Sequence, residues 1–184
     1  MFVMMVCAAA LVAAAGVHSE PAQAAHSPAT SPAKSAIKDP EVIDLAGFQR
    51  LLASQKGHPL LLSIWATWCE PCRDEYPMIN ELAKQYAPQG LHVVGVSYDD
   101  DAEMTLVRHF LARNNPIFIN YRKRMGHVDQ FDRGVDPTWR GELPVNFFYG
   151  ADGRLMYRIV GEQPRAQYEQ AIRGILLTFG AAHQ

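Results

Sequence analysis

The chain has 184 residues, of which 48% are hydrophobic and 20% are charged, and its formal net charge is −2. This composition is that of an ordinary globular protein, and the length fits one domain that folds without disulfide or metal cross-links. Because the net charge is small and no cluster of Lys and Arg stands out, we expect no binding to nucleic acid or to an anionic membrane surface.

The first segment of the chain is typical of an export signal. Residues 2–17 are apolar or small and uncharged, and residues 22–24 (Ala-Gln-Ala) supply the small side chains that a signal peptidase reads. We interpret residues 1–24 as a signal peptide, although no Lys or Arg precedes the apolar stretch. An uncleaved membrane anchor is the alternative, because the stretch falls just short of a spanning length. Lipidation at Cys7 and a buried core helix fit less well.

Residues 25–40 are rich in Ala, Ser and Pro and are interpreted as a flexible linker, which leaves residues 41–184 as one domain. Its hydrophobic pattern predicts alternating strands and helices. In chain order these are a strand at 42–43, a helix from 45 to about 57 capped by Asp44, a strand at 60–65, a helix at 70–86, a strand at 91–97, a helix at 102–113, a strand at 117–120, a short helix near 127–131, a hairpin of strands at 145–149 and 155–159, and a helix from 164 to 180 that buries Phe179.

The strands at 60–65 and 91–97 are continuously apolar, which is typical of strands buried on both faces. The strand, helix and strand between residues 60 and 97 form one right-handed crossover unit. The sequence therefore predicts an α/β sandwich, in which helices cover both faces of a mixed sheet.

Only two cysteines, Cys69 and Cys72, remain once residues 1–24 are removed. A bridge across two intervening residues closes too small a loop to restrict the unfolded chain much. A single close pair in an exported protein is therefore not a structural framework. We expect its function to depend on reversible formation of the disulfide bond.

The two cysteines lie where a buried strand gives way to a helix. Residues three apart on a helix have Cβ atoms about 5–6 Å apart, so a small adjustment brings such a pair into disulfide geometry. We expect Cys69 at the positive end of the helix dipole, where unpaired backbone N–H groups favour the attacking thiolate. Cys72, one turn deeper, is expected to be more shielded and to resolve the mixed disulfide.

Residues 65–77, Trp-Ala-Thr-Trp-Cys-Glu-Pro-Cys-Arg-Asp-Glu-Tyr-Pro, resemble the active-site segment of the thioredoxin superfamily, and specifically of its exported TlpA/ResA-like branch. The likeness covers roughly residues 45–179, and Pro77 matches the kinking proline of thioredoxin-like helices. Residues 143–148 and the Ala-Asp-Gly turn after them resemble the family's cis-proline strand. The resemblance implies a thioredoxin-like three-layer α/β/α sandwich with a mixed sheet and an insertion before that strand.

The same resemblance implies a substrate-binding region. Pro144 is expected to be cis and to lie beside Cys69, and backbone groups at Leu143 are expected to pair with the substrate chain in strand fashion. Trp68 is expected to border this groove, whereas Trp65 is expected in the core. The long stretch before Pro144 either shapes a partner-specific surface or is a plain solvated loop.

One position departs from the cytoplasmic thioredoxins. These carry a buried aspartate six residues before the first cysteine, and here that position is Ser63. Glu75, three residues past Cys72, matches an acidic residue that the ResA-like branch uses near its cysteines. We therefore interpret Glu75 as a proton-transfer and pKa-tuning group. The alternative is a solvated glutamate that stabilises the helix dipole.

Three other readings of the cysteine pair are weaker. A structural zinc site needs four ligands, but no second cysteine pair exists and the histidines show no paired spacing. A peroxidatic enzyme needs a lone reactive cysteine with a hydroxyl and a proline upstream, which Trp68 fits poorly. A redox-inert binding module is hard to reconcile with two intact cysteines at a thiolate-favouring site. We expect no cofactor and no metal.

The sequence thus predicts an exported thiol–disulfide oxidoreductase with Cys69, Cys72 and Glu75 as its catalytic residues, active in the periplasm or another extracytoplasmic compartment. The family likeness favours the reduction of protein disulfides, as in cytochrome c maturation or metal-site cysteines, with electrons from a membrane-embedded donor. A dithiol oxidase or isomerase on the same fold remains the alternative, because 30 mV of potential is only about 1.4 kcal/mol.

Overall fold

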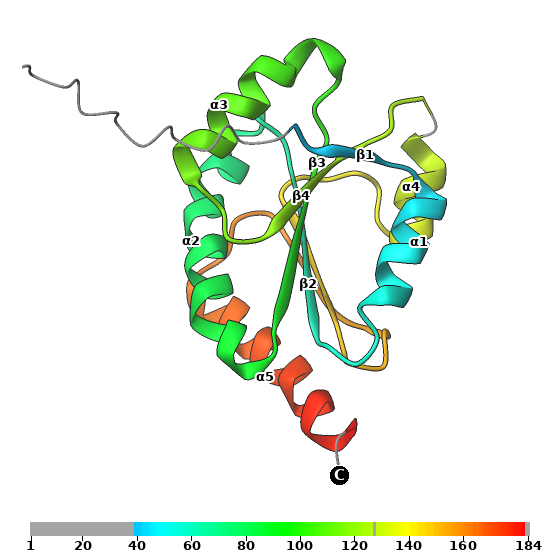
Figure 1. Cartoon of the computed structure of the whole chain (residues 1–184), viewed down its shortest axis with the longest axis vertical. Coiled ribbons are helices and arrows are strands. Elements are labelled where there is room, and N and C mark those ends of the chain that lie inside the picture. Colours follow the sequence, from blue (N-terminus) through cyan, green and yellow to red (C-terminus); the bar gives the residue numbers. More distant parts are fainter. Residues whose placement is uncertain (1–38, 127, 183–184) are drawn as a thin grey trace, which may run out of the picture. The chain divides into compact units, whose positions relative to one another are not determined.

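The computed structural model describes residues 39–126 and 128–182, so the expected signal segment and nearly all of the expected linker lie outside the described residues. Six strands and five α-helices alternate along the described chain (Figure 1). They are β1 (Glu41–Ile43), α1 (Leu45–Ser54), β2 (Leu60–Trp65), α2 (Glu70–Tyr86), β3 (His92–Ser97), α3 (Met104–Asn114), β4 (Ile119–Lys123), α4 (Val128–Val135), β5 (Val145–Tyr149), β6 (Leu155–Val160) and α5 (Arg165–Ala182), with 3₁₀ turns at Ala87–Gln89 and Asp101–Glu103.

The six strands form one mixed sheet in the order β1-β4-β3-β2-β5-β6. Neighbouring strands from β1 to β2 are parallel, and β5 and β6 complete the sheet as an antiparallel hairpin. Every residue of β2 is buried, as its continuously apolar sequence predicts. The predicted α/β fold with a mixed sheet is confirmed.

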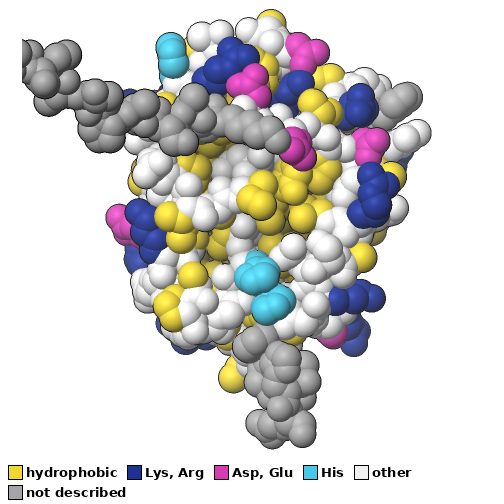
Figure 2. All heavy atoms as spheres, viewed as in Figure 1, with side chains coloured by type: hydrophobic (Ala, Val, Ile, Leu, Met, Phe, Trp, Pro, Cys, Tyr) yellow, Lys and Arg dark blue, Asp and Glu magenta, His cyan; other side chains and the backbone are white. Residues whose placement is uncertain are grey.

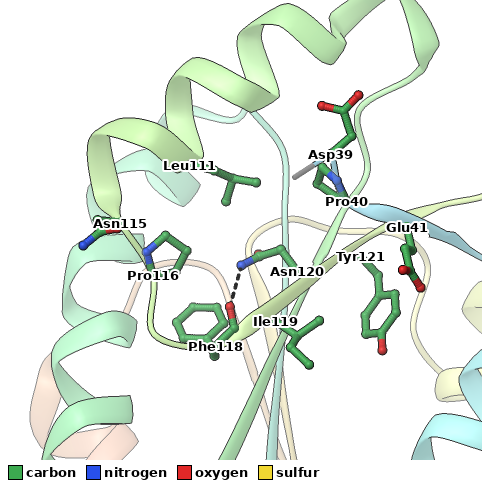
Figure 3. A pocket seen from close by; sticks show the side chains of 10 residues that line it. All are labelled: Asp39, Pro40, Glu41, Leu111, Asn115, Pro116, Phe118, Ile119, Asn120 and Tyr121. Atoms are coloured by element: carbon green, nitrogen blue, oxygen red, sulfur yellow. Dashed lines mark hydrogen bonds between the residues drawn. The ribbon is translucent and has the colours of Figure 1, made fainter. Parts of the chain in front are cut away.

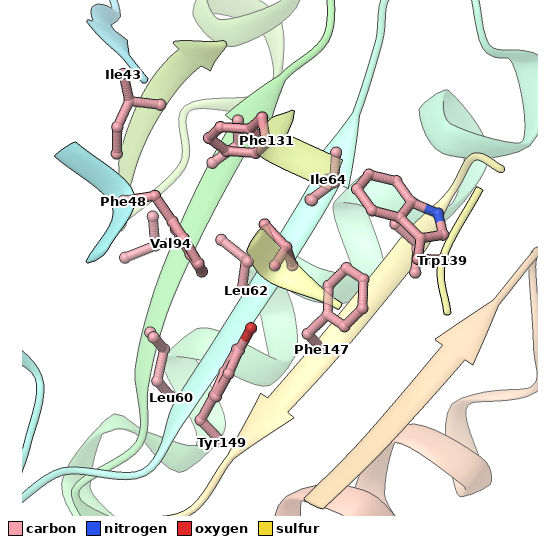
Figure 4. Close-up of a cluster of buried hydrophobic side chains, with 13 residues drawn as sticks. Ile43, Phe48, Leu60, Leu62, Ile64, Val94, Phe131, Trp139, Phe147 and Tyr149 are labelled. Carbon is pink, nitrogen blue, oxygen red and sulfur yellow. The ribbon is translucent and has the colours of Figure 1, made fainter. Parts of the chain in front are cut away.

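One face of the sheet is covered by α1 and α4 (Figure 1). Phe48 of α1 and Phe131 of α4 lie with ring centroids 5.6 Å apart, above strand residues such as Leu62. Trp139 and Phe147 continue the same cluster, with ring centroids 5.4 Å apart (Figure 4). The segment between β4 and β5 therefore closes this side of the core.

The opposite face of the sheet packs against α2 and α5. Leu61 and Phe148, whose side chains alternate with those of the first cluster, contact Ile79 and Leu82 of α2 and Ile172 of α5 within one buried cluster. The sheet thus has helices on both faces, which places the N-terminus of α2 at the end of the buried strand β2.

β4 differs from the prediction at both ends. A strand was expected at residues 117–120, but β4 extends to Lys123 and Ile117 precedes it. Its last two residues are charged and nevertheless buried: Arg122 pairs with Asp101, and the Lys123 ammonium lies 3.6 Å from Asp132. Buried charges with partners are invisible to a hydrophobic pattern, which explains the error.

α4 is found where a short helix was expected, although it runs further, to Val135. The last helix is also found, but the side chain of Phe179 lies outside those described. In the described part of the chain, none of the helices combines the length and the apolar character needed to cross a bilayer.

Candidate active site

Cys69 and Cys72 form a disulfide at the start of α2, with Cα atoms 5.2 Å apart. Cys69 is the N-cap residue of the helix, and its Sγ accepts a hydrogen bond from the backbone N–H of Cys72 at 3.2 Å. The expected spacing and the expected position at the positive end of the dipole are both present. A thiolate at Cys69 would therefore meet a donor that is already in place.

The two cysteine residues differ in exposure. Cys69 is 6% exposed and Cys72 is 1% exposed, so the second cysteine is the more shielded, as predicted. Trp68, directly before the pair, has 58% of its surface exposed, whereas Trp65 is buried. The surface beside the disulfide therefore carries a large indole that the fold itself does not cover.

The chain before β5 comes close to the cysteine pair. The Leu143–Pro144 peptide bond is cis, which agrees with the family resemblance. Leu143 packs against the buried cluster that contains Cys69 and Cys72. Leu143 is thus brought to the cluster of Cys69, from which it is 74 positions away in the sequence (143 − 69).

A buried carboxylate that the sequence analysis missed holds the loop before Cys69. Asp99 follows β3 and is fully buried; its two carboxylate oxygens accept the backbone N–H of Thr67 at 3.0 and 3.1 Å, and one of them also accepts the Thr67 hydroxyl. Ser97 donates to the same carboxylate at 2.6 Å, and the Arg73 guanidinium donates to the Thr67 carbonyl at 2.8 Å. The loop is therefore fixed from both sides.

A second polar cluster fixes the side chains beneath the site. Asn120 of β4 accepts hydrogen bonds from the Trp65 indole at 3.1 Å and from the Tyr76 hydroxyl at 3.0 Å. The Asn120 amide occupies the space above Gly95, where a Cβ would collide with it. The glycine in β3 therefore makes room for the amide that joins β2 to α2.

Glu75 is buried on α2, with 3% of its surface exposed, so the reading as a solvated glutamate is wrong. Its Oε1 accepts a hydrogen bond from Asn146 Nδ2 at 2.5 Å, and its Oε2 accepts one from the Tyr168 hydroxyl at 2.6 Å. Burial raises the pKa of the Glu75 carboxyl, and these two hydrogen bonds oppose the rise. A carboxyl one turn from Cys72 is thus held where it can titrate closer to neutral pH.

Asn146 and Tyr168 were predicted only as members of a strand and a helix. Asn146 is a polar residue within an otherwise apolar buried strand, and this was the signal that the sequence offered. It stands directly opposite Ser63 in the antiparallel pair of β5 and β2. Ser63 thus lies beside the amide that binds Glu75, at the position where cytoplasmic thioredoxins carry their aspartate.

A pocket of about 320 Å³ lies between α3, β4 and the start of β1, and Asn120 is one of its lining residues (Figure 3). Leu111, Phe118 and Ile119 give it apolar walls, and none of the predicted site residues lines it. Apolar side chains also gather on the face of the molecule around it (Figure 2). The cysteine pair lies instead beside the exposed Trp68.

No group of three or more His, Cys, Asp or Glu side chains suited to hold a metal ion occurs among the residues that the structure describes. Two histidines without paired spacing in the sequence do meet in space: His58 and His92 stack with ring centroids 4.1 Å apart. Figure 2 shows two histidine side chains in contact on this face. They lie at the start of β2 and β3, at the opposite end of these strands from the cysteines.

The sequence matches the AhpC/TSA family over residues 33–158. The chain belongs to this family. Among its relatives, the thiol–disulfide oxidoreductase ResA of Bacillus cereus is 30% identical over 134 residues, which are 73% of this chain and 73% of ResA. The thiol:disulfide interchange protein DsbE of Yersinia pestis is 34% identical over 116 residues, 63% of this chain and 56% of DsbE.

A solved structure also shows the likeness to thiol:disulfide interchange proteins. The DsbE-type thiol:disulfide interchange protein of Chlorobium tepidum superposes with a TM-score of 0.58 at 27% identity, covering 68% of this chain and 84% of that one. This ResA-like member of the family is therefore a thiol–disulfide oxidoreductase of thioredoxin-like fold, and the CxxC pair at the start of α2 fits that activity. Its partners are protein thiols and disulfides.

Proposed function

We propose that this chain reduces disulfide bonds in proteins outside the cytoplasm, with Cys69 as the attacking sulfur and Cys72 as the resolving sulfur. The observation that carries the proposal is the place of Cys69 at the N-cap of α2, where the Cys72 N–H already points at its Sγ. Helix dipole and hydrogen bond both favour a thiolate at this atom. The larger exposure of Cys69 supports the same order of attack.

The reaction consists of two exchanges. The Cys69 thiolate attacks one sulfur of the substrate disulfide, whose S–S bond breaks; the departing substrate thiolate takes a proton from water. Cys72 then gives up its proton and attacks the Cys69 sulfur, so that the Cys69–substrate bond breaks and the second substrate thiolate leaves. The substrate gains two electrons, and the chain is left with the disulfide seen in the structure.

Glu75 is the proposed acceptor of the Cys72 proton. It lies one turn further along the same helix, is buried, and has a pKa that burial raises above the ordinary glutamate value. General bases work best when their pKa lies near the working pH. Trp68, Leu143 and Pro144 are the proposed substrate-binding residues, because the exposed indole and the chain before β5 flank the cysteine pair.

The setting of the reaction follows from the sequence. The export signal proposed for residues 1–24, cleaved or kept as an anchor, would place the domain in the periplasm or an equivalent compartment. An oxidising compartment does not regenerate a dithiol, so a membrane-embedded donor is proposed to supply the electrons. Cysteines for haem attachment or for metal sites, which must stay reduced there, are the proposed substrates.

The reduction potential of the Cys69–Cys72 couple tests the direction. A reductase is expected near or below the potential of thioredoxin, about −270 mV, whereas a value near −120 mV would indicate an oxidase. Equilibration of the purified domain with glutathione buffers or with thioredoxin gives this value directly. A domain that turns over no disulfide once reduced would exclude both and leave a binding module.

A trapping experiment tests the order of the sulfurs. Cys72→Ser is expected to accumulate a mixed disulfide between Cys69 and a disulfide-bonded substrate, because the resolving thiol is absent. The matched variant Cys69→Ser is expected to trap at least tenfold less, since Cys72 is buried. Equal trapping by both variants would contradict the assignment of the attacking sulfur.

A further inference from the structure

Asn146 is fully buried, yet only one end of its amide is used. Its Nδ2 donates to Glu75 and lies 3.4 Å from the Tyr168 hydroxyl oxygen, whereas its Oδ1 has no hydrogen-bond partner among the described residues. Buried polar atoms are nearly always paired, so an unpaired one in a fully buried amide requires an explanation. The carbonyl oxygen is an acceptor that this state of the site does not use.

The Glu75 carboxyl is held by residues from two further elements. Asn146 on β5 donates to one oxygen and Tyr168 on α5 donates to the other, so both hydrogen bonds suit a carboxylate. The charged group that acts on the carboxyl from outside α2 is Glu162, before α5, which disfavours the carboxylate. On α2 itself, Cys72 lies one turn away and titrates only when the disulfide is reduced.

A protonated Glu75 needs a different set of partners. A carboxylic acid carries one O–H that must donate, and Asn146 Nδ2 cannot accept it. Rotation of the amide by about 180° would bring Oδ1 to the position of Nδ2, because the two ends of an amide have nearly the same shape. The unused acceptor of Asn146 is therefore the partner that an O–H at Oε1 lacks, whereas an O–H at Oε2 can donate to the Tyr168 hydroxyl oxygen.

We propose that Asn146 and Tyr168 are positioning residues for the proton transfer at Glu75, and that the Asn146 amide turns from donor to acceptor when Glu75 takes up the Cys72 proton. This inference rests on the proton-transfer role proposed for Glu75. It goes beyond that role by naming the two residues that adjust the pKa of the Glu75 carboxyl. The same two residues stabilise its ionised and its protonated form.

The titration of Glu75 in the oxidised protein tests the positioning, since the bridged cysteines do not titrate. We expect Tyr168→Phe, which removes only the hydroxyl, to raise the midpoint of the Glu75 carboxyl ¹³C titration by about one pH unit, because a charge-assisted hydrogen bond to the carboxylate is lost. Tyr157→Phe is the matched control, because the Tyr157 ring is 43% exposed, and it should leave the midpoint unchanged. An unchanged midpoint in Tyr168→Phe would overturn the role of Tyr168.

The amide turn has its own readout in the unmodified sequence. The side-chain NH₂ signals of Asn146 are expected to move with the same midpoint as the Glu75 carboxyl, since Nδ2 loses this acceptor on protonation. Asn146→Leu is expected to raise that midpoint as Tyr168→Phe does. If the NH₂ signals stay constant across the titration, the proposed rotation of the Asn146 amide is wrong. This test uses the natural sequence, so it holds even if Asn146→Leu fails to fold.

Activity separates this inference from the proposed function. If Glu75 accepts the proton, Glu75→Gln changes the pH profile of disulfide reduction, and adding Tyr168→Phe changes it no further, because Tyr168 acts through Glu75. An additive effect in the double variant would overturn the positioning role alone. A normal profile in Glu75→Gln would overturn the proton-transfer role and, with it, the positioning role, whatever the carboxyl titration shows.

Discussion

The Glu75 carboxyl is a buried acid, and its burial has a cost in stability. Because burial raises the pKa of Glu75 in the folded state, the folded protein binds a proton more tightly than the unfolded chain. Its contribution to stability is full below the ordinary glutamate pKa and is lost as the pH rises through the raised value. Above that raised value the ionised carboxyl therefore weakens the fold.

Glu75→Gln is accordingly expected to make the oxidised protein more stable at pH 7, by about 1 kcal/mol. A glutamine can still accept from Tyr168 and can donate to Asn146 Oδ1. Urea unfolding at pH 7 and pH 4.5 checks this, and the gain should shrink at the lower pH. A variant that is less stable at pH 7 would contradict the proposed cost of ionisation.

A glycine is needed at position 95 because the Asn120 side chain occupies the space of a Cβ, and not because of its backbone conformation. Gly95→Ala is expected to lower the free energy of unfolding by about 2 kcal/mol, because the new Cβ would push the Asn120 amide off Trp65 and Tyr76. Thermal unfolding measures the loss. The penalty should become smaller in an Asn120→Ala background, where the collision is absent; an equal penalty there would locate its cause elsewhere.

The sequence alone identified the two cysteines as the redox pair, because a close cysteine pair between an apolar strand and a helix has few functions other than disulfide exchange. It did not locate Asp99 or the partners of Glu75. Asp99 follows an apolar strand, where an aspartate is equally common as a solvated turn residue. Only the parallel pairing of β2 with β3 brings it to the loop before Cys69.

At the scale of elements, the charged end of β4 anchors α4. The buried Lys123 ammonium lies 3.6 Å from Asp132 of α4 and 4.0 Å from the centre of the Tyr98 ring, and the Tyr98 hydroxyl donates to Asp132 at 2.6 Å. For the long stretch before Pro144, the sequence left two interpretations open, a partner-specific surface or a plain solvated loop. In the structure, a buried ionic cluster holds the α4 part of this stretch against the sheet.

Asp132→Asn is expected to lower the free energy of unfolding by about 3 kcal/mol, because a buried ammonium then loses its carboxylate. Denaturant unfolding measures the change. Asp74→Asn, on the exposed side of α2, is the control and should have little effect. If the additional change Lys123→Met does not recover part of the loss, the ion pair is not its cause.

The elements themselves followed the hydrophobic pattern closely where both faces are buried or where a turn signal is strong. β2 was predicted to the residue, and the turn before β6 has Gly153 at a positive φ of 80°, as expected. The pattern failed at β4, where Arg122 and Lys123 are buried with acidic partners. Such pairing depends on residues of other segments, here Asp101 and Asp132, and the hydrophobic pattern does not show which segments meet.

At the scale of the whole molecule, an ion pair joins the segment after α4 to the edge strand β6. Asp136 accepts from the Arg158 guanidinium at 2.8 Å and from Thr138 at 2.8 Å. Burial raises the pKa of Asp136, but the Thr138 hydrogen bonds and Arg158 outweigh it, so the pKa is lowered overall. This contribution to stability is present above the ordinary aspartate pKa and is lost as the pH falls through the lowered value.

Asp136→Asn is therefore expected to cost about 1 kcal/mol at pH 7 and progressively less below about pH 4. Urea unfolding between pH 7 and pH 3 gives the two curves, which should converge in acid. Curves that stay parallel over this range would show that the loss comes from packing and not from the charge.

The exposed Trp68 indole has a consequence for the proteins that the site would select as substrates. A flat aromatic surface next to a reactive sulfur gains free energy when an apolar segment lies on it, and compact proteins keep such segments inside. Clients would thus be chosen by how much of their interior they still display. With the export and the substrate-binding role of Trp68 proposed above, chains that have not finished folding would meet that condition best.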